Sequence, residues 1–118
     1  MEKGNIILTK TYEFALSIVK LNRILREQHK EYELSKQILR SGTSIGANSE
    51  EGLAAQSRRD FISKYSIALK EARETHFWLR ILRDSGYIDS TIAKSYINDC
   101  EEIAKILTAI IKTTKHNS

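Results

Sequence analysis

Hydrophobic residues recur every three or four positions through most of the chain, which is the period of an amphipathic α-helix. Short polar segments separate four such stretches, and none shows the sustained alternation of a β-strand. The pattern predicts helices over residues 6–29, 34–56, 61–84 and 90–111. Four amphipathic helices with short connections are typical of an all-α fold, an antiparallel up-down-up-down four-helix bundle. At 118 residues we expect this bundle to be one domain, 1–118.

Capping residues mark the ends of the predicted helices. Ser57 stands three residues before Asp60, an arrangement like a capping box, and predicts the start of the third helix. Gly86 is expected to close that helix in a left-handed conformation. Asp89 or Ser90 is expected to cap the fourth helix.

The second predicted helix carries small and polar residues on the side that should face the core. Alternating steps of four and three pick out Leu34, Ile38, Ser41, Ile45, Asn48, Gly52 and Ala55. Each glycine within a helix costs about 0.8–1 kcal/mol relative to alanine. Because Gly42, Gly46 and Gly52 fall within eleven residues, we expect close helix approach to compensate for them. The pattern predicts a tightly buried helix with polar groups inside.

Charged and amide side chains on or beside the inward positions predict a buried polar network. Its members are Arg40, Asn48, Glu51, Glu71 and Glu74. We expect Asn48, Glu51 and at least one of the other two glutamates to be mostly buried, with Arg40 within reach of a salt bridge. A carboxylate metal site is the alternative, but Arg73, not a glutamate, stands three residues before His76. Since buried ions must be paired, an arginine–carboxylate network is more economical, and we expect no metal and no cofactor.

No pattern in the chain indicates an enzyme. Cys100 lies on an apolar helix face, as a small core residue does. The three histidines show no ligand spacing, and the glycines of the second helix do not form a phosphate-binding loop after a strand. A single cysteine excludes an internal disulfide and fits a reducing compartment. With neither a signal-peptide pattern nor an apolar run long enough to span a bilayer, we expect a cytoplasmic protein without membrane contact.

The charge is mildly basic, with a formal net value of +4. Such basicity permits nucleic-acid binding without demanding it, and a solvated surface of mixed charge is the alternative. An antiparallel bundle brings the ends of the first and third helices to the same end of the molecule. The candidate nucleic-acid-binding residues there are Lys20, Arg23, Arg26, Lys30, Arg80 and Arg83, with Lys36 nearby. No recognition helix or stacking aromatic is evident, so we expect largely sequence-independent binding.

The apolar faces of the third and fourth predicted helices are wider than one small bundle needs. Phe77, Trp78 and Tyr87 add aromatic surface near one end. Self-association would use this excess.

Several runs of residues resemble a known family. They are LRSGTSIGAN at 39–48, Glu51, AAQSRRDFISK at 54–64 and IALKEARETHFWL at 67–79. These runs resemble the small bacterial four-helix bundle proteins encoded in intervening sequences of 23S rRNA genes. The resemblance covers about half of the chain, and the flanking helices agree in pattern only. Ser49-Glu50 departs from an apolar residue common in relatives, and Gly52 from a common alanine.

The resemblance implies a four-helix bundle and, by analogy with one branch, a homopentameric ring. That branch is the accessory variability determinant of diversity-generating retroelements, a basic barrel that binds a reverse transcriptase and nucleic acid. No catalytic residue carries over. We therefore expect a non-enzymatic homo-oligomer that binds RNA or DNA through its charge. The alternative is a protein-interaction scaffold, for example a reverse-transcriptase accessory subunit, with no direct nucleic-acid role.

Overall fold

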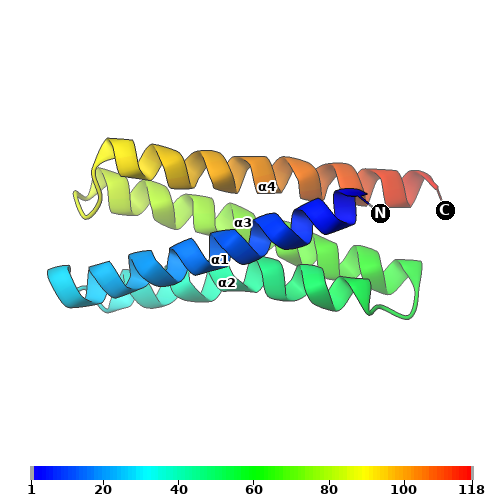
Figure 1. The fold of residues 1–118 in the computed structure, drawn as a ribbon, viewed down its shortest axis with the longest axis horizontal. Coiled ribbons are helices and arrows are strands. Elements are labelled where there is room, and N and C mark those ends of the chain that lie inside the picture. The colour runs from blue at the N-terminus through cyan, green and yellow to red at the C-terminus, as the bar shows by residue number, and fades with distance from the viewer. Residues whose placement is uncertain (1, 118) are drawn as a thin grey trace.

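Four antiparallel helices make up the part of the chain that the computed structural model describes, residues 2–117 (Figure 1). They are α1 (Glu2–His29), α2 (Glu33–Leu53), α3 (Arg58–Asp84) and α4 (Ser90–His116). Successive helices run in opposite directions, and within the described residues there is no strand. The predicted all-α, up-down-up-down bundle is confirmed. The helix α4 continues past its predicted end at residue 111 to His116.

The predicted caps form. The hydroxyl of Ser57 accepts a hydrogen bond from the Asp60 amide at 3.0 Å, which begins α3. At α4 it is the Asp89 carboxylate that accepts the amide of Ile92, at 2.9 Å. Gly86 has a φ of +87° after the end of α3, a conformation that favours glycine. These contacts are local, which is why short motifs predict them.

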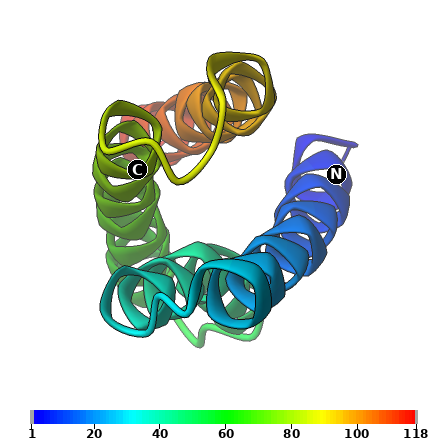
Figure 2. The same ribbon diagram turned by 90° about the vertical axis from the view of Figure 1, so that its left-hand side faces the viewer.

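Each helix packs against the next along the chain, but α1 and α4 meet over only part of their length. The molecule extends 47 × 22 × 19 Å. The N-terminal half of α1 approaches α4, whereas its C-terminal half lies against α2 and away from the start of α4 (Figures 1 and 2). Ile24 on α1 and Ile92 on α4 are therefore 41% and 48% exposed. The divergence of α1 leaves Ile92 uncovered (Figure 2).

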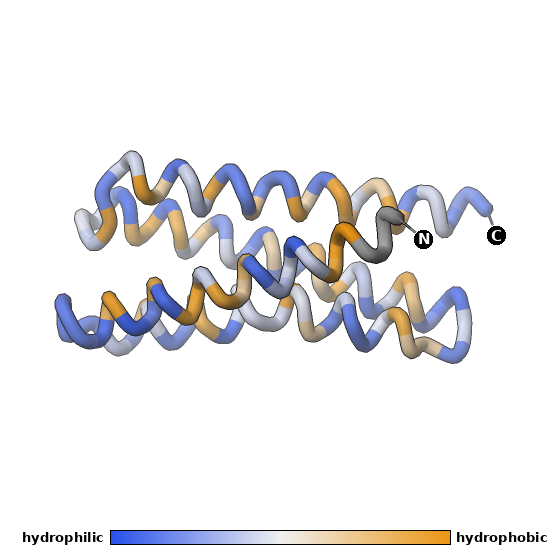
Figure 3. Tube along the Cα trace, in the orientation of Figure 1, coloured by the Kyte–Doolittle hydropathy of each residue, from blue (hydrophilic) through white to orange (hydrophobic). Residues whose placement is uncertain are grey.

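Hydrophobic residues recur at intervals along every helix, separated by hydrophilic ones, as the helical period predicted (Figure 3). The buried core draws on all four helices, with Ile18, Ile45, Leu79 and Leu107 fully enclosed. Burying such side chains stabilises the fold by roughly 1.5–3 kcal/mol each.

The glycines of α2 allow close helix approach, as predicted. A Cβ added to Gly42 would lie 2.8 Å from Cγ1 of Ile18 on α1. One added to Gly52 would lie 2.5 Å from Cε1 of Tyr65 on α3. Glycine is required at both positions because the facing side chains occupy the space of a methyl group.

The polar groups buried inside α2 are serine hydroxyls, and each forms a hydrogen bond. Ser41 is fully buried, and its Oγ lies 2.9 Å from Oγ1 of Thr75 on α3. Ser49 is also fully buried and donates to the carbonyl of Ile45 at 2.8 Å. These bonds satisfy groups whose burial would otherwise cost free energy.

Tyr65 packs well but carries an unsatisfied hydroxyl. Its ring stacks on Phe61 with centroids 4.2 Å apart, and its buried Oη has no hydrogen-bond partner among the described residues. Desolvation raises the pKa of this phenol. Because an unsatisfied buried hydroxyl costs about 1–3 kcal/mol, Tyr65→Phe is expected to increase the free energy of unfolding by about 1 kcal/mol.

Urea denaturation measures this change, and Tyr96→Phe is the matched control. The Tyr96 hydroxyl donates to the carbonyl of Ser17 at 3.0 Å, so its removal should lower stability by about 1 kcal/mol. Equal losses from both substitutions would contradict the prediction.

Exposed large apolar residues are more numerous on α1 than on α3 and α4, where the sequence pattern predicted the surplus. The exposed large apolar residues are Ile6, Tyr12, Leu16 and Ile24 on α1, Ile67 and Phe77 on α3, and Ile92 on α4, with Tyr32 and Leu53 at the ends of α2. The wide apolar face of α4 is buried because α4 packs on α3 and, farther along, on α1. The predicted surplus on α3 and α4 is therefore limited to Ile67, Phe77 and Ile92.

Candidate nucleic-acid interface

A groove follows the outer side of α1 and its turn into α2. One part has a volume of about 490 Å³ and is lined by Val19, Asn22, Arg23, Arg26, Glu27, Lys30 and Tyr32. A second part of about 200 Å³ is lined by Asn22, Arg26, Tyr32, Glu33, Ser35, Lys36 and Leu39. The two parts share three residues, and we call them together the basic groove.

A tight turn between α1 and α2 builds the floor of this groove. Lys30 has a φ of +53°, so the chain reverses immediately after α1 ends. The carboxylate of Glu31 then accepts hydrogen bonds from the amides of Leu34 and Ser35, at 3.1 and 2.8 Å. These two bonds satisfy free amides of the α2 N-terminus, where a negative charge is favourable. Asn22 ties the helices together, since its Nδ2 donates to the Ser35 carbonyl at 2.9 Å.

The cations of the groove are not neutralised by any carboxylate among the described residues. Within the described residues, none of Arg23, Arg26, Lys30 and Lys36 forms an ion pair. The Lys30 ammonium donates instead to the carbonyl of Glu27, at 3.1 Å. Four cationic side chains are thus available to an anion, although the carboxylates of Glu27 and Glu33 lie in the same groove.

The other predicted basic residues lie elsewhere. Lys20 is exposed on α1 but does not line the groove. Arg80 donates to Nδ1 of His76 at 3.1 Å, and Arg83 pairs with Asp84 at 2.8 Å. Both are on α3, which lies diagonally across the bundle from α1 (Figure 2). The structure therefore brings Arg23, Arg26 and Lys30 together and leaves the α3 pair apart, because sharing one end of a bundle does not mean sharing one side.

An aromatic side chain that the sequence analysis did not single out stands in the groove. Tyr32 is 51% exposed, and the guanidinium of Arg26 lies 5.8 Å from its ring centroid. The sequence pattern predicted no aromatic residue among these cations, and the structure places Tyr32 beside them. The available signal was a tyrosine in an otherwise polar connection, between Lys30 and Lys36.

The predicted polar network forms in part, at the surface between α2 and α3. Nη1 of Arg40 lies 3.2 Å from both carboxylate oxygens of Glu71, and Nη2 bonds Glu74. The indole of Trp78 also donates to Glu74, at 3.2 Å. Desolvation alone would raise the pKa of Glu74, but the hydrogen bonds from Arg40 and Trp78 bring it below its usual value. The same carboxylates, Glu74 first, raise the pKa of Arg40, whose side chain is 48% exposed.

Two predicted members of the network lie outside it, and the prediction of their burial was wrong. The side chain of Glu51 is 61% exposed and pairs with Lys64 at 3.0 Å. Asn48 is half-buried and donates to the carbonyl of Ser44 in its own helix. Gly42 and Gly46 pack against α1 and Gly52 packs against α3, and in this orientation of α2 Ser49, not Asn48, lies in the core.

The remaining candidates for chemistry are structural. Cys100 is a core residue, as predicted, with Sγ 3.1 Å from the carbonyl of Ala72. Desolvation, with smaller contributions from Glu101 and Asp99, raises the pKa of its thiol to about 12, so it is un-ionised at neutral pH. Among the described residues no three or more histidine, cysteine or acidic side chains gather as metal ligands. None of the helices, over the residues described, is both long and apolar enough to cross a membrane.

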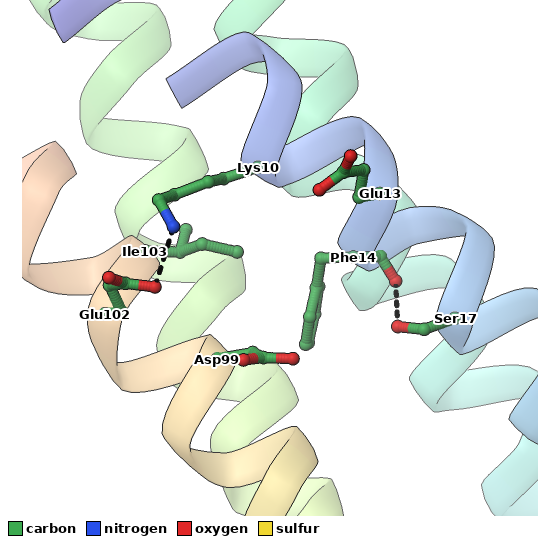
Figure 4. A pocket seen from close by; sticks show the side chains of 7 residues that line it. All are labelled: Lys10, Glu13, Phe14, Ser17, Asp99, Glu102 and Ile103. Carbon is green, nitrogen blue, oxygen red and sulfur yellow. Dashed lines mark hydrogen bonds and ion pairs between the residues drawn. The ribbon is translucent and has the colours of Figure 1, made fainter. Parts of the chain in front are cut away.

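A smaller cavity between α1 and α4 has the opposite charge. Its volume is about 140 Å³, and its lining residues are Lys10, Glu13, Phe14, Ser17, Asp99, Glu102 and Ile103 (Figure 4). Lys10 bridges to Glu102 at 2.9 Å, and two more carboxylates remain at the rim. An acidic rim repels phosphates, so this cavity is no candidate for nucleic acid.

Comparison with known proteins places the chain in a family. The sequence model of the 23S rRNA-intervening sequence protein family matches residues 3–109. The chain is also similar to a crystal structure of a protein with unknown function from the S23 ribosomal protein family of Bacteroides thetaiotaomicron VPI-5482. The two share 53% identity and a TM-score of 0.92, over 93% of this chain and 98% of the other. No curated protein matches. The resemblance drawn from the sequence is confirmed, and the chain belongs to the family of 23S rRNA-intervening sequence proteins.

Proposed function

We propose that the protein is a non-enzymatic, cytoplasmic, self-associating helical bundle that binds RNA or DNA through the basic groove. The observation that carries the proposal is the gathering of Arg23, Arg26, Lys30 and Lys36 around one groove without ion pairs among the described residues. Unpaired cations in a concave surface attract phosphates, and each contact releases counterions.

Self-association would multiply this charge. A net charge of +4 is modest for one chain, but five copies would carry +20. The pentameric number comes from the resemblance to the retroelement accessory proteins. The exposed apolar residues of α1, foremost Tyr12 at 59% and Leu16 at 50%, support the tendency to associate.

Sedimentation equilibrium is expected to give five times the chain mass of 13.5 kDa. Tyr12→Glu with Leu16→Glu should lower that mass, because both side chains are exposed on one face of α1 and charges there oppose an apolar interface. Helicity by circular dichroism should stay unchanged, since neither residue belongs to the buried core. A wild-type monomer at tens of micromolar would reject self-association.

The decisive experiment on function is binding of a fluorescent structured RNA, followed by anisotropy at low salt. Wild-type protein should bind saturably, and Arg23→Glu with Arg26→Glu should abolish binding. The matched control is Arg58→Glu with Arg59→Glu, which makes the same charge change at exposed positions at the opposite end of the bundle. Loss of binding in both variants would mean that net charge, not the groove, is responsible.

A protein-interaction scaffold, such as a reverse-transcriptase accessory subunit, is the second candidate. Phe77 favours it, since this ring is 45% exposed and packs edge-on against Trp78 with centroids 5.1 Å apart. Exposed aromatic pairs are typical of protein interfaces. Phe77→Ala should then weaken binding to the partner and leave RNA binding unchanged.

A further inference from the structure

We propose that the basic groove is a site for single-stranded nucleic acid, in which one unpaired base stacks on Tyr32 while the flanking phosphates contact the cations. This inference rests on the proposed function and specifies its ligand. It predicts a preference for unpaired strands over duplexes, and it assigns a role to Tyr32.

The position of Tyr32 carries the argument. Its ring lines both parts of the groove, with Arg23 and Lys30 in one part and Lys36 in the other. A strand that crosses the ring would therefore find cations before and after it. Arg26 lies near the ring and lines both parts, so its guanidinium is placed to contact a phosphate or the stacked base.

The exposure of the ring fits stacking better than a structural role. Tyr32 is the residue that precedes α2, and its side chain makes no capping hydrogen bond. Glu31 caps the helix instead, because its carboxylate accepts hydrogen bonds from the amides at the start of α2. The helix N-terminus is thus unavailable to a phosphate, and the surrounding side chains must supply the contacts.

A buried amide is a second feature of the groove that suits a base. Asn22 is 8% exposed and lines both parts. Its Nδ2 is bonded to the carbonyl of Ser35, whereas its Oδ1 accepts no hydrogen bond from any residue described. A carboxamide oxygen so placed can accept from the amino group of a base. Neither this acceptor nor the ring would serve a duplex, whose bases are already stacked and paired.

The test separates base contacts from phosphate contacts. Short single strands of RNA and DNA are compared with an abasic strand of equal length and with a duplex. Wild-type protein should bind both base-bearing strands about tenfold more tightly than the abasic strand, as expected for one stacked base. RNA and DNA should behave alike, because stacking does not involve the 2′-hydroxyl.

Substitution of Tyr32 provides the control. Tyr32→Ala should lose most of the preference for base-bearing strands, leaving only what the Asn22 contact supplies, and Tyr32→Phe should retain the tenfold difference. The exposed position leaves helicity unaffected in both variants.

Two outcomes overturn the inference. A wild-type preference for duplex would do so, as would a Tyr32→Ala variant that keeps the full tenfold discrimination against the abasic strand. If Arg23→Glu with Arg26→Glu abolishes binding in either case, the proposed function survives without the stacking site. Absence of binding to every strand would refute both.

Discussion

Raising the salt concentration from about 50 to about 200 mM is expected to weaken RNA binding by about a thousandfold, if six or more phosphates are contacted. The reason is that each phosphate contact displaces a condensed cation from the nucleic acid, and added salt opposes this release. In the proposed oligomer, the four cations of each groove, which form no ion pair among the described residues, would provide enough contacts.

The slope of log affinity against log salt identifies which cations take part. Arg23→Ala with Arg26→Ala should reduce the magnitude of the slope by about one for each arginine that contacts a phosphate. Arg58→Ala with Arg59→Ala should leave it unchanged, because these residues begin α3 at the other end of the bundle. An affinity that stays constant with salt would show that the groove is an ordinary solvated surface, since apolar interfaces do not weaken in this way.

Gly42→Ala and Gly52→Ala are each expected to lower the free energy of unfolding by about 1–3 kcal/mol. Helix propensity alone predicts the reverse, since alanine is favoured over glycine by about 1 kcal/mol. The new methyl groups would lie 2.8 Å from Ile18 and 2.5 Å from Tyr65, and both neighbours are fully buried. Because the two sites face different helices, their effects should add, to about 2–6 kcal/mol in the double variant.

Gly46→Ala is the matched control within the same helix. Its methyl group would lie 3.3 Å from Cβ of Thr11, a contact that a small shift relieves. The gain in propensity should offset the cost, so we expect a change within about 0.5 kcal/mol. Urea denaturation of the four variants checks the series, and stabilisation by Gly42→Ala or Gly52→Ala would contradict the packing argument.

The sequence predicted only part of the candidate site. Periodicity and the antiparallel topology predicted that Arg23, Arg26 and Lys30 would lie at the end of the bundle shared with Arg80 and Arg83. They could not predict the side, which depends on how α1 and α3 are placed around the axis. Tyr32 was missed for a related reason, since only the turn at Lys30 places its ring between the cations. Likewise, Arg40 pairs with a carboxylate of α3, as predicted. The face of α2 that carries Asn48 and Glu51, however, points away from the core.

Local interactions determined what the amino-acid sequence revealed by itself: the number of helices, their direction and most of their ends. A cap such as Ser57 or Asp89 acts over three residues, and the apolar period acts within one helix. The tertiary structure decided the rest, because contacts between distant residues orient each helix. Close packing of Gly42 on Ile18 and of Gly52 on Tyr65 sets the rotation of α2. The divergence of α1 from α4 decides which apolar residues stay exposed, and the α1–α2 pairing decides which cations share a groove.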